Sequence, residues 1–148
     1  MDHLFVVRTG EHGPHRNLTQ VGRATVGRLG KLIGKTGHTK GNGVSIVSSP
    51  RKDAITTARI IARHLRTTNV EEDRALYIAA RGNQEVQDVI AARRAKVMVL
   101  VTHCDICKRF PKEYLEREFG TFAEIPELDN GTAVHFNLRL GTHSILRT

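Results

Sequence analysis

The sequence predicts an α/β protein, a three-layer α/β/α sandwich with a largely parallel sheet, built as one domain over residues 1–148. Three observations lead to this fold class. A length of 148 residues suits one domain that buries a sizeable core. Hydrophobic residues make up 39% and charged residues 26% of the chain, which is ordinary for a folded protein. Short apolar runs alternate with amphipathic segments over the whole length, as strands and crossover helices do.

Short runs of apolar residues predict the strands. Residues 4–7 and 44–47 each end at polar or turn-forming residues and are expected to be buried. Residues 97–101 are the strongest strand candidate, because all five are apolar and most are β-branched. Residues 133–138 and 143–146 can supply the last strands of the sheet.

Apolar residues at helical spacing predict the helices between these strands. Thr19 is a good N-cap for the first of them, and residues 73–77 are expected to be a connection. The last helix is expected to carry Pro111 in its first turn and Gly120 just past its end. The predicted helices extend over residues 19–33, 51–65, 85–94 and 111–119.

Composition narrows the classes of function. Only four consecutive apolar residues occur near the N-terminus, too few for a signal peptide or a membrane span, so we expect a cytoplasmic protein without a membrane partner. A net charge of +8 favours anionic partners without identifying one. In a parallel sheet, ligands bind beyond the carboxyl ends of the strands. Functional residues are therefore expected just after Val7, Val47 and Val101.

Those three strand ends carry motifs that resemble the histidine phosphatase superfamily, also called the phosphoglycerate-mutase-like family. The Arg-Thr-Gly-Glu run at 8–11 resembles the family's Arg-His-Gly-Glu signature, and the Leu-Thr-x-x-Gly run at 18–22 resembles its usual helix start. The run at 48–58 is similar to the family's S-S-P-x-x-R-A-x-x-T-A element, and the Val-Thr-His run at 101–103 to the strand that delivers its second histidine. The Leu-Tyr pair at 76–77, before an alanine-rich stretch, most resembles the short phosphohistidine-phosphatase branch.

The resemblance implies a phosphoglycerate-mutase-like fold and a mechanism that needs no cofactor or metal. In that mechanism a histidine after the first strand is phosphorylated, two arginines and a second histidine hold the phosphoryl oxygens, and an acid protonates the leaving group. On this sequence, Arg8 and His103 match the arginine and the second histidine. The nucleophile position is Thr9 and the second arginine's position is Asp53, so two of the four groups differ.

Both differences oppose the implied chemistry. A threonine hydroxyl becomes a nucleophile only with a partner base. His103 could be that base, although in the family its site contacts phosphate oxygen. Asp53 replaces a cation by an anion; it is expected to oppose phosphate or to pair with Arg8 across the pocket. We therefore expect an impaired or inactive phosphatase-like protein that still binds an anionic ligand, a phosphorylated small molecule or phosphoprotein, or a protein partner.

Other residues could compensate. Glu11 is a candidate acid or a hydrogen-bond partner for Arg8. Arg51 or Lys52 could restore the missing positive charge, or both could face solvent in the first turn of a helix. An active phosphatase with a non-standard nucleophile would use one of two histidines in the first loop, His12 or His15.

Two further alternatives stay open. A zinc-type or redox site could draw on a set of side chains near the strand ends, namely His12, His15, Asp53, His103, Cys104 and Cys107. Nucleic acid could bind a basic stripe on the second helix and a second basic cluster, although no aromatic residues are interleaved for base stacking and a solvated helix face explains the stripe better. The basic residues are Arg59, Arg63, Arg66, Arg93, Arg94 and Lys96. The oligomeric state does not follow from the sequence.

Overall fold

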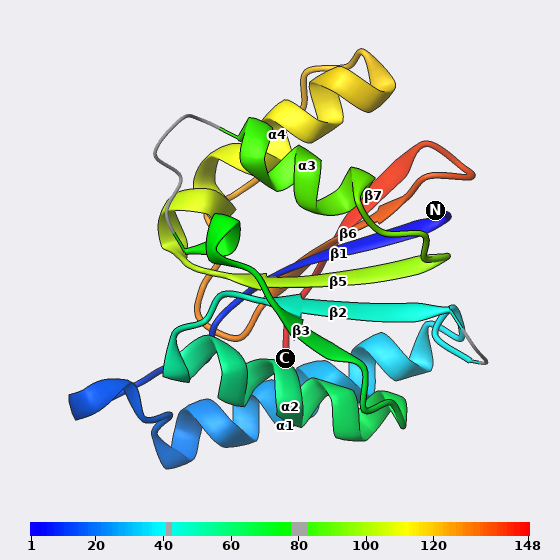
Figure 1. Cartoon of the computed structure of the whole chain (residues 1–148). Coiled ribbons are helices and arrows are strands. Elements are labelled where there is room, and N and C mark those ends of the chain that lie inside the picture. The colour runs from blue at the N-terminus through cyan, green and yellow to red at the C-terminus, as the bar shows by residue number, and fades with distance from the viewer. Residues whose placement is uncertain (41–42, 78–82) are drawn as a thin grey trace.

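The computed structural model describes residues 1–40, 43–77 and 83–148, and its centre is a six-stranded sheet (Figure 1). The strand order is β3-β2-β5-β1-β6-β7. The first four strands in that order are parallel, and β6 and β7 are antiparallel additions at one edge. The predicted, largely parallel sheet is therefore confirmed. Its strands are β1 (His3–Arg8), β2 (Val44–Ser48), β3 (Val70–Glu72), β5 (Val97–Thr102), β6 (Ala133–Asn137) and β7 (Thr142–Leu146).

Helices cover both faces of the sheet and make the predicted three layers (Figure 1). The helices α1 (Gln20–Lys35) and α2 (Lys52–Leu65) pack on one face, and α3 (Gln84–Ala91) and α4 (Cys104–Phe119) on the other. Alternate residues of β1 enter the two cores, as the pleat requires: Phe5 joins the core under α1 and α2, and Val6 joins the core under α3 and α4. The fold is that of the predicted α/β/α sandwich.

Three elements differ from the sequence prediction. The strand β3 lies in a stretch for which the sequence predicted no element, and a 3-10 turn at Arg74–Leu76 occupies part of the connection expected over residues 73–77. The helix α3 ends at Ala91, earlier than expected, and the chain then turns so that Arg93 reaches two acidic side chains near β3. The helix α4 begins at Cys104, seven residues before Pro111, which lies inside it. Proline removes one backbone hydrogen bond from a helix, and here the apolar face on both sides of Pro111 packs in the core and compensates.

The register of the central strands aligns their carboxyl ends. Arg8 pairs with Thr102, and Ser48 pairs with Val101. The three loops that follow β1, β2 and β5 therefore leave the sheet at the same edge. No helix in the described ranges is both long enough and apolar enough to span a membrane. The alanine-rich stretch after Tyr77, which formed part of the family resemblance, lies outside the described residues.

Candidate functional site

A pocket of about 230 Å³ lies where β1, β2 and β5 end, at the edge that the sequence predicts. It brings together seven of the residues singled out from the sequence with three others. The residues that line it are Arg8, Thr9, His12, Arg16, Arg51, Asp53, His103, Cys104, Asp105 and Asn130.

Backbone hydrogen bonds fix the end of β1, which carries Arg8 and Thr9. The Thr9 amide donates to the Thr102 carbonyl at 3.0 Å, and the Gly131 amide donates to the carbonyls of both Arg8 and Thr9 at 3.1 Å. The Arg8 guanidinium donates to the Leu128 carbonyl, so part of its donor capacity is used inside the protein. Thr9 is only 5% exposed. Thr9, which the resemblance places at the nucleophile position, is therefore held by backbone hydrogen bonds and nearly closed to solvent.

The loop after Thr9 is held against α1 and α2. The Gly10 amide donates to the Thr57 hydroxyl at 3.1 Å, and that hydroxyl donates to the Asp53 carbonyl at 2.8 Å. A Cβ on Gly10 would lie 2.7 Å from a methyl group of Val26, so only glycine fits between the loop and α1. These contacts give a structural reason for two motif residues, Gly10 and Thr57, that is independent of catalysis.

His103 is the N-cap residue of α4 and its ring lies in the pocket. Its Nε2 hydrogen-bonds the Ser49 hydroxyl at 2.8 Å, and Tyr77 packs edge-on against the ring. Burial lowers the pKa of His103 below 6.5; the Asp53 charge raises it in partial opposition, and Arg16 and His12 lower it further. At neutral pH the imidazole is therefore uncharged, and its nearest described hydrogen-bond partner is Ser49, not Thr9.

Asp53 is the anion at the bottom of the pocket. It is 1% exposed, and neither carboxylate oxygen has a hydrogen-bond partner among the described residues. Its Oδ2 lies 3.7 Å from His12 Nε2, 3.8 Å from Arg16 Nη1 and 3.8 Å from His103 Nδ1. The expected pairing with Arg8 is not formed, because Arg8 turns to the Leu128 carbonyl and the first loop supplies the nearer cation.

Arg16 is one of three pocket residues that were not predicted from the sequence, the others being Asp105 and Asn130. Arg16 is the last residue of a 3-10 turn, Pro14–Arg16, in the first loop, and both His15 and Arg16 have positive φ, 56° and 58°. Two adjacent non-glycine residues in the left-handed region cost free energy and persist where surrounding contacts compensate. Here the conformation directs Arg16 toward Asp53, whereas His15 does not line the pocket. Every basic residue of the first loop is a candidate for the pocket, but no local motif singles out Arg16.

Arg51 also lines the pocket, whereas its neighbour Lys52 is exposed. The Arg51 guanidinium carbon lies 5.2 Å from the centre of the Tyr77 ring, in cation–π contact. Its Nη2 is buried without a hydrogen-bond partner in the described part of the chain. Of the two cations that the sequence offered as a substitute for the arginine expected from the family resemblance, Arg51 is therefore the one that lines the pocket.

Glu11 does not reach Arg8 or the pocket, contrary to expectation. Its carboxylate accepts a hydrogen bond of 2.7 Å from the Thr19 hydroxyl, and its carbonyl accepts one of 3.0 Å from the Thr19 amide. The Thr19 hydroxyl in turn accepts from the Gly22 amide and caps α1 as predicted. Glu11 therefore supports the start of α1 through its two hydrogen bonds with Thr19.

The alternative metal or redox site at the strand ends is only partly assembled. His12, Asp53, His103 and Cys104 line the pocket, but among the described residues the sole group of three or more ligand side chains whose ligand atoms all lie within 4.8 Å of one another is at the other end of the sheet. Cys107 faces the core, and burial raises the pKa of its thiol well above the usual value, which disfavours the thiolate that metals and disulfide exchange need. Cys104 alone lines the pocket.

The two basic clusters differ in the structure. Arg59, Arg63 and Arg66 are exposed, as a solvated stripe on α2 would be. In the other cluster Arg93 forms two ion pairs, with Nε 2.9 Å from a carboxylate oxygen of Glu71 and Nη2 3.3 Å from one of Asp73.

A larger cavity, of about 860 Å³, lies between the carboxyl-terminal ends of α1 and α2 and is bordered by Lys31, Lys35, Lys40 and Arg66. It contains none of the strand-end residues.

Comparison with solved structures identifies the fold. A proposed phosphohistidine phosphatase SixA from Agrobacterium tumefaciens superposes with a TM-score of 0.72 at 12% identity, with 99% of each chain covered. A protein histidine phosphatase SixA bound to tungstate gives 0.66 at 12% identity, covering 97% of this chain and 94% of that one. A mycobacterial glucosyl-3-phosphoglycerate phosphatase bound to VO₃ gives 0.64 at 15% identity, covering 91% and 90%. No protein-family model and no curated protein sequence matches the chain.

The chain therefore has the fold of the histidine phosphatase superfamily, the phosphoglycerate-mutase-like fold. Within that fold its similar structures include the short SixA-type phosphohistidine phosphatases, which it matches over nearly the full length of both chains. The resemblance inferred from the strand-end motifs is confirmed at this level.

Proposed function

We propose that this chain is a catalytically impaired relative of the histidine phosphatases that binds a phosphorylated or similar oxyanionic ligand at the strand-end pocket without forming a phosphohistidine. The observation that carries the proposal is the buried Asp53 carboxylate, which lies among His12, Arg16 and His103 beside a threonine at the nucleophile position.

The lack of a nucleophile supports the loss of turnover. The Thr9 hydroxyl needs a base to attack phosphorus. His103 is the candidate base, but its Nε2 hydrogen-bonds the Ser49 hydroxyl and not that of Thr9. A phosphoryl group at the pocket would also approach the fixed negative charge of Asp53. At an effective dielectric of 20, two like unit charges about 5 Å apart repel by about 3 kcal/mol. That repulsion acts on the charge that builds up on a transferring phosphoryl group.

The remaining cations support binding. Three arginines line the pocket against two carboxylates, and Arg51 has a buried nitrogen with no hydrogen-bond partner in the described residues. An oxyanion would accept hydrogen bonds from such guanidinium groups in a bidentate manner. Asp53 is expected to weaken this binding without abolishing it, which suits a ligand that is held and released unchanged.

Binding and turnover can be measured separately. Tungstate, an oxyanion that is not hydrolysed, is titrated calorimetrically into the unaltered protein, Arg8→Gln and the control Arg59→Gln, which removes an exposed arginine of α2. We expect binding to the unaltered protein and the control. A lost charge-assisted hydrogen bond is worth about 1.5–3 kcal/mol, so Arg8→Gln should bind about 10- to 100-fold more weakly. An aryl phosphate incubated with the unaltered protein should release no phosphate above background. Equal tungstate binding by all three proteins would contradict the proposed site.

A second candidate function is favoured by the position of His12, whose Nε2 lies 3.7 Å from Asp53 Oδ2 in the pocket. An aspartate beside a histidine can orient the ring and stabilise its charged form. In this alternative His12 replaces the missing nucleophile, and the protein is an active phosphatase. Turnover that disappears in His12→Ala and persists in His15→Ala would establish it in place of the impaired enzyme.

A further inference from the structure

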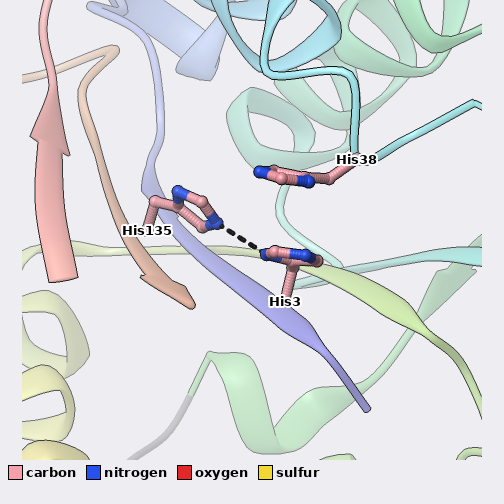
Figure 2. A group of neighbouring side chains, drawn as sticks. All are labelled: His3, His38 and His135. Atoms are coloured by element: carbon pink, nitrogen blue, oxygen red, sulfur yellow. Dashed lines mark hydrogen bonds between the residues drawn. The ribbon is translucent and has the colours of Figure 1, made fainter. Parts of the chain in front are cut away.

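Three histidines from separate segments meet at the end of the sheet opposite the strand-end pocket (Figure 2). His3 begins β1, whereas the pocket lies after Arg8 at the other end of that strand. His135 is on β6, and His38 lies in the loop after α1. None of the three belongs to the motifs that resemble the phosphatases.

Strand pairing explains why two of these imidazoles face each other. His135 pairs in register with Phe5, two residues beyond His3 on the same face of β1, and its ring stacks on Phe5 with 4.3 Å between centroids. This packing holds the His135 ring in place. Its Nε2 lies 3.1 Å from His3 Nδ1, and Figure 2 shows the two ring edges turned toward each other.

The distances suit a shared metal ion. One ring nitrogen from each histidine lies within 4.8 Å of one from each of the others. Zn–N bonds of about 2.0–2.1 Å at tetrahedral angles place two ligand nitrogens about 3.4 Å apart, close to the separation of His3 and His135. The His38 ring stacks flat on His3 at 3.7 Å between centroids and must turn its edge toward the same point. The His38 side chain is exposed, which leaves room for its ring to rotate.

The surroundings keep the rings in the form that binds metal. His3 and His135 are 7% and 8% exposed. Burial lowers the pKa of His135 to about 4 and also lowers that of His3, and the neighbouring histidines add to both shifts. Both rings are therefore neutral at neutral pH, with lone pairs available. A hydrogen bond between the two rings uses only one lone pair and one N–H, whereas a metal ion uses a lone pair from each ring.

We propose that His3, His38 and His135 form a three-histidine site for a divalent transition metal of the zinc class, with solvent as the fourth ligand at the exposed side of His38. Imidazole ligands suit Zn²⁺, Cu²⁺ and Ni²⁺, and zinc accepts three protein nitrogens and a water. His3 and His135 are 132 residues apart in the sequence. A bound ion therefore ties the start of β1 to the α1–β2 loop and β6, and stabilises the fold at the end remote from the pocket.

The test uses the full-length chain without an affinity tag, stripped of metal by a chelator. Zn²⁺ is titrated calorimetrically, and Co²⁺ is added separately because its visible absorption reports coordination geometry. The variant His38→Gln removes an exposed ligand, and the control His15→Gln removes an exposed histidine near the opposite end of the sheet. NMR of the histidine ring nitrogens in the unaltered protein identifies the ligands without any substitution.

We expect one Zn²⁺ per chain, a thermal midpoint that rises with Zn²⁺, and Zn²⁺-induced shifts of the ring nitrogens of His3, His38 and His135. Loss of a group that orients a ligand costs about 10- to 100-fold in metal affinity, and loss of a ligand itself should cost at least as much in His38→Gln. His15→Gln should bind like the unaltered protein. The proposal is overturned if no stoichiometric metal binds, if His38→Gln and the unaltered protein bind alike, or if other histidines shift.

Discussion

Neutralising the buried carboxylate in the strand-end pocket should strengthen oxyanion binding. Asp53→Asn keeps the side-chain shape and removes one negative charge that is 1% exposed and lies 3.8 Å or less from His12, Arg16 and His103. Those groups would then be free to bind an added anion, because no internal anion would compete for them. The prediction isolates the electrostatic part of the proposal from the loss of the nucleophile.

The size of the effect follows from the geometry. An anion that contacts the groups around Asp53 would lie about 5 Å from its carboxylate, and at an effective dielectric of 20 one pair of like charges repels by about 3.3 kcal/mol. Solvent at the mouth of the pocket and salt reduce this value. Half of it is about 1.7 kcal/mol, which corresponds to about 15-fold in affinity. We therefore expect the affinity for tungstate to rise by about 10- to 100-fold.

Isothermal titration of tungstate into Asp53→Asn and the unaltered protein measures the change, with Asp105→Asn as the matched control. Asp105 also borders the pocket but is exposed, so the same change of charge is screened and should alter affinity only a few-fold. Similar gains in both variants would show that overall charge, not the buried carboxylate, controls binding. An unchanged or lower affinity in Asp53→Asn would refute the reasoning.

Two other predictions follow from the pocket and its support. NMR titration should give His103 a pKa below 6.5. The pKa should be still lower in Asp53→Asn, because the carboxylate charge raises the pKa of His103 in the unaltered protein. Since the pKa is lower in the folded state than in the unfolded state, the contribution of His103 to the free energy of unfolding is present above pH 6.5 and is lost as the pH falls through the folded pKa. A higher pKa in the variant would contradict the assigned contact. Gly22→Ala should lower the free energy of unfolding in urea by about 1–3 kcal/mol, because the new Cβ would lie 2.2 Å from the Glu11 carbonyl oxygen. The control Gly27→Ala, whose Cβ meets nothing closer than 3.7 Å, should gain up to about 1 kcal/mol from helix propensity; equal effects would contradict the packing argument.

Local sequence signals were sufficient for most of the fold. The strand at 97–101 consists of apolar residues, and the Thr19 cap lies directly before the first amphipathic helix, so both were predicted correctly. The strand β3 was missed because two of its three residues are glutamates at the sheet edge, where no apolar pattern is needed. The start of α4 was missed because Pro111 reads locally as a first-turn residue, whereas tertiary packing extends the helix before it.

The candidate site was only partly accessible from sequence. Parallel strands bring their carboxyl ends together, which is why Arg8, Asp53 and His103 could be placed near one another. Arg16 reaches the pocket through two left-handed residues that no pattern in the loop specifies. The three histidines at the other end could not be grouped from sequence, because only the sheet register and the end of α1 bring His3, His38 and His135 together.

The most direct test of the central proposal is phosphatase turnover on an aryl phosphate and on phosphohistidine. It compares the unaltered protein, His103→Ala, and the double variant Thr9→His/Asp53→Arg, which restores the two groups expected from the family resemblance. We predict that the unaltered protein and His103→Ala release no phosphate above background, and that the double variant gains turnover. Turnover by the unaltered protein that His103→Ala abolishes would contradict the proposal and leave an active enzyme with an unconventional nucleophile.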